Sequence, residues 1–132
     1  MIFPLLVMVV LTFAVAAFLL FTRVNAVRSG AVKFSYFRLM QGEAPDNVLA
    51  ASRHFENLFQ MPVLFYAAAV LAIAGNLQSN FLIGLAWIFV IARAVHTVIH
   101  LTSNNINQRL TAFLVSNAAL LVMWLVIGWH FF

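Results

Sequence analysis

Apolar residues follow one another in four long stretches along the chain, and the first of them carries no charge at all. The hydrocarbon core of a bilayer is roughly 30 Å thick, and about 20 helical residues cross it. Each stretch is close to that length. The pattern therefore predicts four transmembrane helices, at about residues 2–22, 48–74, 81–101 and 108–132.

The connections between these stretches differ in length. A long one covers residues 23–47, whereas residues 75–80 form a tight turn and residues 102–107 a short polar loop. Short links make neighbouring helices antiparallel. We therefore expect an all-α membrane protein in which residues 1–132 form a single domain, a four-transmembrane-helix up-down bundle. The first stretch has no basic segment before it and is followed by further spans, so we expect a true span and not a cleaved signal peptide.

Composition narrows the class of protein. Of 132 residues, 65% are hydrophobic and 8% charged, which leaves too few polar side chains to cover a soluble surface. A soluble enzyme, a nucleic-acid-binding module and a disordered tail are excluded. The seven Lys and Arg residues are scattered, so no nucleic-acid partner is expected. Cysteine is absent, so thiol chemistry has to come from a ligand.

The basic residues indicate an orientation. Four of them lie in the first connection, whereas the turn at residues 75–80 and both ends of the chain carry none. Basic loops tend to stay on the cytoplasmic side. We expect a multi-pass protein of a bacterial inner or plasma membrane, with this connection in the cytoplasm and both chain ends on the opposite side.

Two helices carry polar stripes that a membrane should not tolerate without a reason. Residues spaced at i, i+3, i+4 and i+7 share one face of a helix. The second helix has such a series, the third helix repeats it, and the fourth begins with an arginine. The two series are Arg53, Glu56, Asn57 and Gln60, and Arg93, His96, Thr97 and His100, followed by Arg109.

The charges in these stripes do not balance. Glu56 is the one carboxylate in the spans, against three arginines, so two positive charges are left for an anionic ligand. A structural interpretation stays open, in which Glu56 pairs with Arg53 or Arg93 and Arg109 extends to the membrane surface. His96 and His100 have a spacing that could bind a metal, but no carboxylate or cysteine completes the site and the arginines repel cations, so no metal is expected.

These motifs resemble the MAPEG family, the membrane-associated proteins in eicosanoid and glutathione metabolism. The segment Arg93-x-x-His96-Thr97-x-x-His100 is similar to the family's third-helix signature Arg-x-x-His-Thr-x-x-Tyr. Arg109 stands at the family's arginine before the fourth helix. The resemblance is to the branch that contains microsomal prostaglandin E synthase and microsomal glutathione transferase. Two weaker matches are Arg53-x-x-x-Asn57-x-x-Gln60 and the basic stretch Arg28 to Lys33.

The resemblance implies a homotrimer with glutathione bound between subunits near the cytoplasmic face. Arg109 would be catalytic, because it matches the arginine that supports the glutathione thiolate, and phenylalanines beside it would hold a lipophilic substrate. The protein's partners would be a second and third copy of itself, membrane lipid and that small molecule. The residues expected to bind glutathione are Lys33, Arg53, Asn57, Gln60, Arg93, His96 and His100.

Four positions depart from the family pattern. Glu56 stands where the family often has an arginine, and its charge would repel the carboxylates of glutathione. His100 and Phe113 replace tyrosines, and Leu110 replaces a polar residue. Two functional hypotheses follow: a glutathione-dependent transferase, isomerase or peroxidase, and a catalytically silent trimer that is structural or binds another anion.

Overall fold

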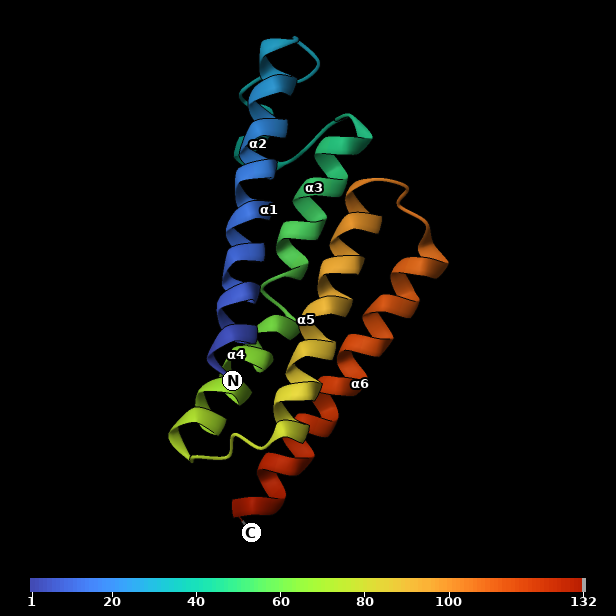
Figure 1. Cartoon of the computed structure of the whole chain (residues 1–132). Coiled ribbons are helices and arrows are strands. Elements are labelled where there is room, and N and C mark those ends of the chain that lie inside the picture. The colour runs from blue at the N-terminus through green and yellow to red at the C-terminus, as the bar shows by residue number, and fades with distance from the viewer. Residues whose placement is uncertain (132) are drawn as a thin grey trace.

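A computed structural model describes residues 1–131, which form an all-helical bundle (Figure 1). Four helical segments are long and apolar enough to cross a membrane, as the sequence predicts; α3 and α4 together make the second of them. The chain is therefore an integral, multi-pass membrane protein. The helices are α1 (Ile2–Arg28), α2 (Tyr36–Leu39), α3 (Asp46–Asn57), α4 (Met61–Ala74), α5 (Asn80–Leu101) and α6 (Ile106–Phe131).

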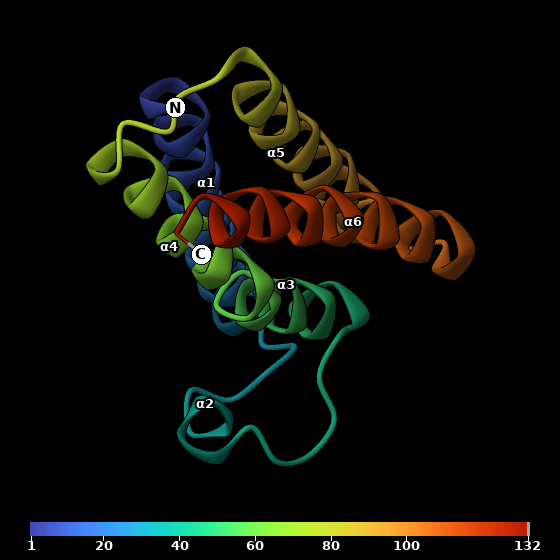
Figure 2. The same cartoon turned by 90° about the horizontal axis from the view of Figure 1, so that it is seen from below.

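The spans alternate in direction. The N-terminus and the C-terminal end of α6 lie at one end of the bundle, while α2 and the α5–α6 loop lie toward the other (Figure 1). Helix α5 packs most extensively against α6, and it also contacts α1 and α3. The short helix α2 stands aside from the bundle, on the side of α1 and α3 (Figure 2). The connection that carries Lys33 and Arg38 lies at the opposite end of the molecule from the start of α1 and the end of α6.

Helix α1 continues beyond its expected end near residue 22 and stops at Arg28. After Pro4 in its first turn, α1 contains no proline or glycine, and Gly30, with a φ of 73°, ends the helical path. The extension is fixed by Arg23, whose Nη2 donates to Ser52 Oγ on α3 at 3.1 Å. The guanidinium also lies 5.2 Å from the centre of the Phe37 ring. These contacts hold the end of α1 against α3 and α2.

The second span is broken into two helices, and is not the single helix at about residues 48–74 that the sequence predicts. Helix α3 ends at Asn57 and α4 begins at Met61. Pro62 lies in the first turn of α4, where a residue without an N–H is tolerated because that group has no helical partner. The break lies just before the proline, and tight i→i−3 bonds such as Gln60 N to Asn57 O close the turn. Arg53, Glu56 and Asn57 of the polar stripe are consequently on α3, whereas Gln60 lies in the turn before α4.

The apolar core lies in the half of the bundle nearer the chain ends. The rings of Phe65 on α4 and Phe89 on α5 stack with centroids 4.5 Å apart, and neither is exposed. Three alanines of α4 are also fully buried. Small residues let membrane helices approach closely, so packing contacts replace the hydrophobic driving force that a bilayer does not supply. The three alanines are Ala68, Ala69 and Ala72.

Candidate functional site

A completely buried arginine, Arg93 of α5, lies in the other half of the bundle. Its Nη2 atom donates to Asn57 Oδ1 at 2.5 Å and contacts the Asn57 carbonyl oxygen at 3.4 Å. Asn57 is the last residue of α3, so the break in the second span presents both of its oxygens to Arg93. Within residues 1–131, the Nε and Nη1 atoms of Arg93 have no hydrogen-bond partner. Arg93 is therefore anchored on one side only.

Asn57, and not Glu56, is the hydrogen-bond partner of Arg93. Asn57 holds it, whereas Glu56 is exposed on α3. The two neighbours point in different directions because successive residues of a helix are about 100° apart. The interpretation of Glu56 as a structural partner of Arg93 is thus wrong, and a neutral amide does not cancel the charge of the guanidinium.

Three histidines surround this region. His54 of α3 and His96 and His100 of α5 are buried, with ring centroids 4.9–5.7 Å apart. His54 Nε2 lies 2.9 Å from Thr97 Oγ1, and that hydroxyl donates to the Arg93 carbonyl oxygen at 2.8 Å. A hydrogen-bonded chain thus connects α3 to the backbone of α5.

His54 is the residue that sequence reasoning missed. It is next to Arg53 in the sequence, but the charged stripe that begins at Arg53 lies on the exposed face of α3, whereas His54 lies on the buried face. The signal was present, because His54 follows Ala51 by three residues and precedes Leu58 by four, and all three are buried. That spacing defines the inward face of α3.

Arg109 lies in the first turn of α6 and is partly buried. Its Nη1 atom donates to Asn104 Oδ1 at 2.6 Å, while its carbonyl oxygen lies 3.1 Å from His96 Nδ1. The Nε atom is buried and has no hydrogen-bond partner within residues 1–131. The backbone of Arg109 therefore joins the histidine cluster, and its guanidinium lies against the α5–α6 loop.

The other expected site residues lie outside this buried group. Arg53 and Gln60 are exposed, and Gln60 Oε1 accepts a bond from Asn57 Nδ2 at 3.4 Å. Lys33 is exposed on the connection between α1 and α2, which stands aside from α5 and α6 (Figure 2). The expected set is thus divided. The buried group contains Arg93, His96 and His100, and the half-buried Asn57 and Arg109 lie at its edge.

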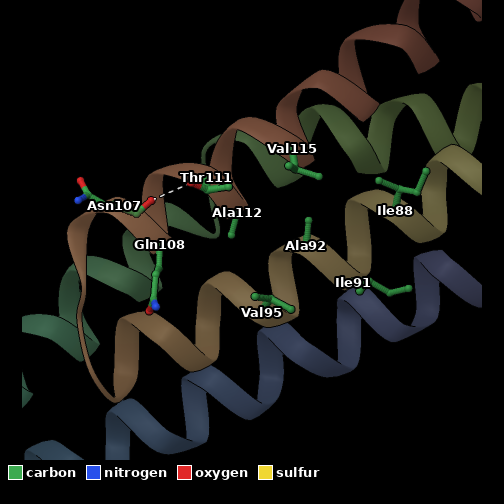
Figure 3. A pocket seen from close by; sticks show the side chains of 9 residues that line it. All are labelled: Ile88, Ile91, Ala92, Val95, Asn107, Gln108, Thr111, Ala112 and Val115. Atoms are coloured by element: carbon green, nitrogen blue, oxygen red, sulfur yellow. Dashed lines mark hydrogen bonds between the residues drawn. The ribbon is translucent and has the colours of Figure 1, made fainter.

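An apolar groove runs between α5 and α6 (Figure 3). Its volume is about 570 Å³, a size typical of small-molecule sites. Its walls are aliphatic along most of their length and become polar at the start of α6. Among residues 1–131, no phenylalanine lines it; Phe113 lies beside His96, with ring centroids 6.2 Å apart. The lining residues are Ile88, Ile91, Ala92, Val95, Asn107, Gln108, Thr111, Ala112 and Val115.

Comparison with known proteins identifies the family. The model of the MAPEG family matches residues 1–129, nearly the whole chain. No match is found among curated proteins or among solved structures. The family match agrees with the four membrane-spanning segments of the structure and with the third-helix motif around Arg93. The chain therefore belongs to the MAPEG family.

Proposed function

We propose that this protein is a glutathione-dependent transferase, isomerase or peroxidase that acts on a lipophilic electrophile. One observation carries the proposal: two nitrogen atoms of the buried Arg93 guanidinium, Nε and Nη1, have no hydrogen-bond partner within residues 1–131. Burying a charge without hydrogen bonds is costly. The Nε–H group and the Nη1–H groups lie on different edges of the guanidinium, and a carboxylate can bind along either edge. Glutathione carries two carboxylates, one for each edge.

Arg109 is proposed to favour the thiolate of the bound glutathione. A guanidinium near a thiol stabilises the charged form, so it lowers the pKa of the thiol and increases its reactive fraction. Arg109 is in the first turn of α6, where the helix dipole also favours negative charge. Its single side-chain bond, to Asn104, leaves the guanidinium able to meet a ligand.

The exposed part of the polar stripe supports a site shared between subunits. Arg53, Glu56 and Gln60 face outward from a single chain, and polar groups at membrane depth are costly when they face lipid. A neighbouring subunit would cover them. We therefore propose a homotrimer with glutathione at the subunit interface, to which Lys33, Arg53 and Gln60 would contribute across that interface.

The α5–α6 groove is the proposed place for the lipophilic substrate. It opens beside the first turn of α6, which carries Arg109, and its aliphatic walls suit a hydrocarbon group. A substrate there would approach from the membrane, and glutathione would approach from the polar end. We propose that this polar end faces the cytoplasm.

A catalytically silent trimer is the second candidate function. Two observations favour it: Leu110 is 53% exposed beside Arg109, and Phe113 presents a ring, not a hydroxyl, to His96. A polar residue and a tyrosine are expected there from the resemblance. In this candidate the polar stripes hold subunits together or bind another anion.

Glutathione titration of the detergent-purified chain tests the proposal. Calorimetry should detect binding, and conjugation to an aryl halide should follow. Arg109→Ala should lower the conjugation rate at neutral pH at least about tenfold, the effect of one unit of thiol pKa, and should leave the oligomer intact. Arg28→Ala, which removes an exposed arginine at the end of α1, should change neither.

Two results would contradict this assignment. The absence of any binding heat with wild-type protein would favour the silent trimer. If Arg109→Ala instead dissociated the oligomer, with the activity of each surviving trimer unchanged, Arg109 would be a structural residue and not a catalytic one.

A further inference from the structure

Three imidazoles meet inside the bundle, although no metal site is expected from the sequence. His54, His96 and His100 are at most 4% exposed, and one ring nitrogen from each lies within 4.8 Å of the others. We propose that these three histidines bind a single transition-metal ion of the zinc class. Imidazole nitrogen suits Zn²⁺, Cu²⁺ and Ni²⁺, and three histidines with an open fourth position form a known type of zinc site.

Hydrogen bonds set the rings in the tautomers that a metal needs. The Thr97 hydroxyl donates to the Arg93 carbonyl, so its oxygen accepts from His54 Nε2. His96 Nδ1 donates to the Arg109 carbonyl oxygen. In a neutral ring the other nitrogen then carries a lone pair, which places lone pairs on His54 Nδ1 and His96 Nε2. Partners of this kind orient the imidazole ligands of metals.

These nitrogens lack any other use in the chain. Within residues 1–131, His54 Nδ1, His96 Nε2 and His100 Nδ1 are buried and have no hydrogen-bond partner. Most buried polar atoms in proteins have one. A single ion would satisfy one nitrogen of each ring at the same time. Zinc–nitrogen distances are about 2.0–2.1 Å, so the rings would turn toward one another as the ion binds.

The positive charge of the ion also has to be accommodated, since Arg93 and Arg109 lie close to the cluster. Three neutral imidazoles do not offset the charge of a divalent ion. An anion at the fourth position, hydroxide or chloride, would do so, and the unpartnered donors of Arg93 are available to such an anion. His100 is in the last turn of α5, next to the exposed loop at residues 102–105, which gives the ion a route from the polar end.

This site goes beyond the proposed glutathione chemistry, and its test uses zinc chloride alone. The full chain is purified in detergent, stripped with a chelator and equilibrated with Zn²⁺. Elemental analysis should find one zinc per chain. His54→Gln and His100→Tyr should each weaken zinc binding at least about tenfold. His130→Ala is the matched control, because His130 is exposed in the last turn of α6, and it should bind zinc like the wild type.

A second measurement needs no variant. Cobalt(II) in a tetrahedral nitrogen site absorbs visible light much more strongly than the hydrated ion, so cobalt-loaded wild-type protein should become intensely coloured and zinc should remove the colour. A wild-type chain that retains no zinc, or a cobalt spectrum like that of the hydrated ion, would overturn the proposal. Equal zinc loss in His54→Gln and His130→Ala would do the same.

Discussion

Helices α3 and α4 are two halves of one membrane span, but they are attached to the bundle in different ways. The buried face of α4 is apolar throughout, and Phe65 stacks on Phe89 of α5. The buried face of α3 includes Ser52 and His54, which bond to side chains of α1 and α5. Packing holds α4, together with one hydrogen bond between the Tyr66 and Thr12 hydroxyls, and directed polar contacts hold α3.

Within this single span, α4 contributes to stability and α3 contributes to the candidate functional site. Van der Waals packing leaves nothing unsatisfied, so the α4 half is complete in itself. The α3 half leaves buried nitrogens of Arg93 and His54 without partners in residues 1–131, and such groups are costly unless a ligand meets them. The break between Asn57 and Met61 lets the two halves differ, because each presents its own face to α5.

The comparison first predicts that the polar and apolar ends of the bundle lie on opposite sides of the membrane. Reporter fusions should therefore be either fully active or inactive. A phosphatase that is active only outside the cytoplasm should be active when fused after Phe132, and a fluorescent protein that matures only in the cytoplasm should be dark there. Fusions after Ser103, in the α5–α6 loop, are the matched control and should give the reverse result. Fluorescence at Phe132 would place the polar half on the other side.

The apolar half should be the more sensitive to loss of volume. Phe65→Ala removes a fully buried ring that stacks on Phe89. It should lower the free energy of unfolding by about 3 kcal/mol. The measurement is a denaturing-detergent titration followed by circular dichroism. Phe13→Ala removes the same ring where it is 72% exposed and should change little. Equal effects would mean that the stacked pair does not stabilise this half.

The polar half should respond to the loss of a single hydrogen bond. Asn57→Ala removes the acceptor side chain of Arg93 and should lower the free energy of unfolding by about 2 kcal/mol, as for other bonds to charged groups. Gln60→Ala, at an exposed neighbour, should have a much smaller effect. The cost of Asn57→Ala should nearly disappear in an Arg93→Met background. A cost that persists there would show that Asn57 acts through the helix end and not through Arg93.

The sequence predicts the polar face of α5 better than that of the second span. Long apolar runs specify the spans, and on the unbroken helix α5 the i, i+3, i+4, i+7 spacing correctly places Arg93, His96 and His100 on one buried face. The same spacing fails on the second span. It groups the charged residues of α3 correctly on one face, but that face is the exposed one, with Arg53 and Glu56, while His54 on another face is buried.

In a membrane protein, hydrophobicity does not distinguish core-facing from lipid-facing residues, so the sequence does not show which apolar side chains are buried. Lipid-facing and core-facing residues are both hydrophobic, so Phe13 and Phe65 look alike in the sequence although one is exposed and the other buried. Which residue accompanies Arg93 depends on how α3 is rotated against α5. That rotation is a tertiary property, and the charged stripe does not show it.

The smallest expected effect concerns Glu56, which lies at the outer edge of the polar half. A carboxylate close to a bound tripeptide repels the carboxylates of that ligand, but Glu56 is exposed and water screens its charge. Glu56→Gln keeps the shape and removes the charge, so calorimetry should show glutathione binding only about threefold to fivefold more tightly. Glu43→Gln, which removes an exposed carboxylate from the α2–α3 connection, should leave the affinity unchanged. Weaker binding in a folded Glu56→Gln protein would mean that the carboxylate contacts the amino group of the ligand, and the outer face of α3 would then belong to the binding site and not to its edge.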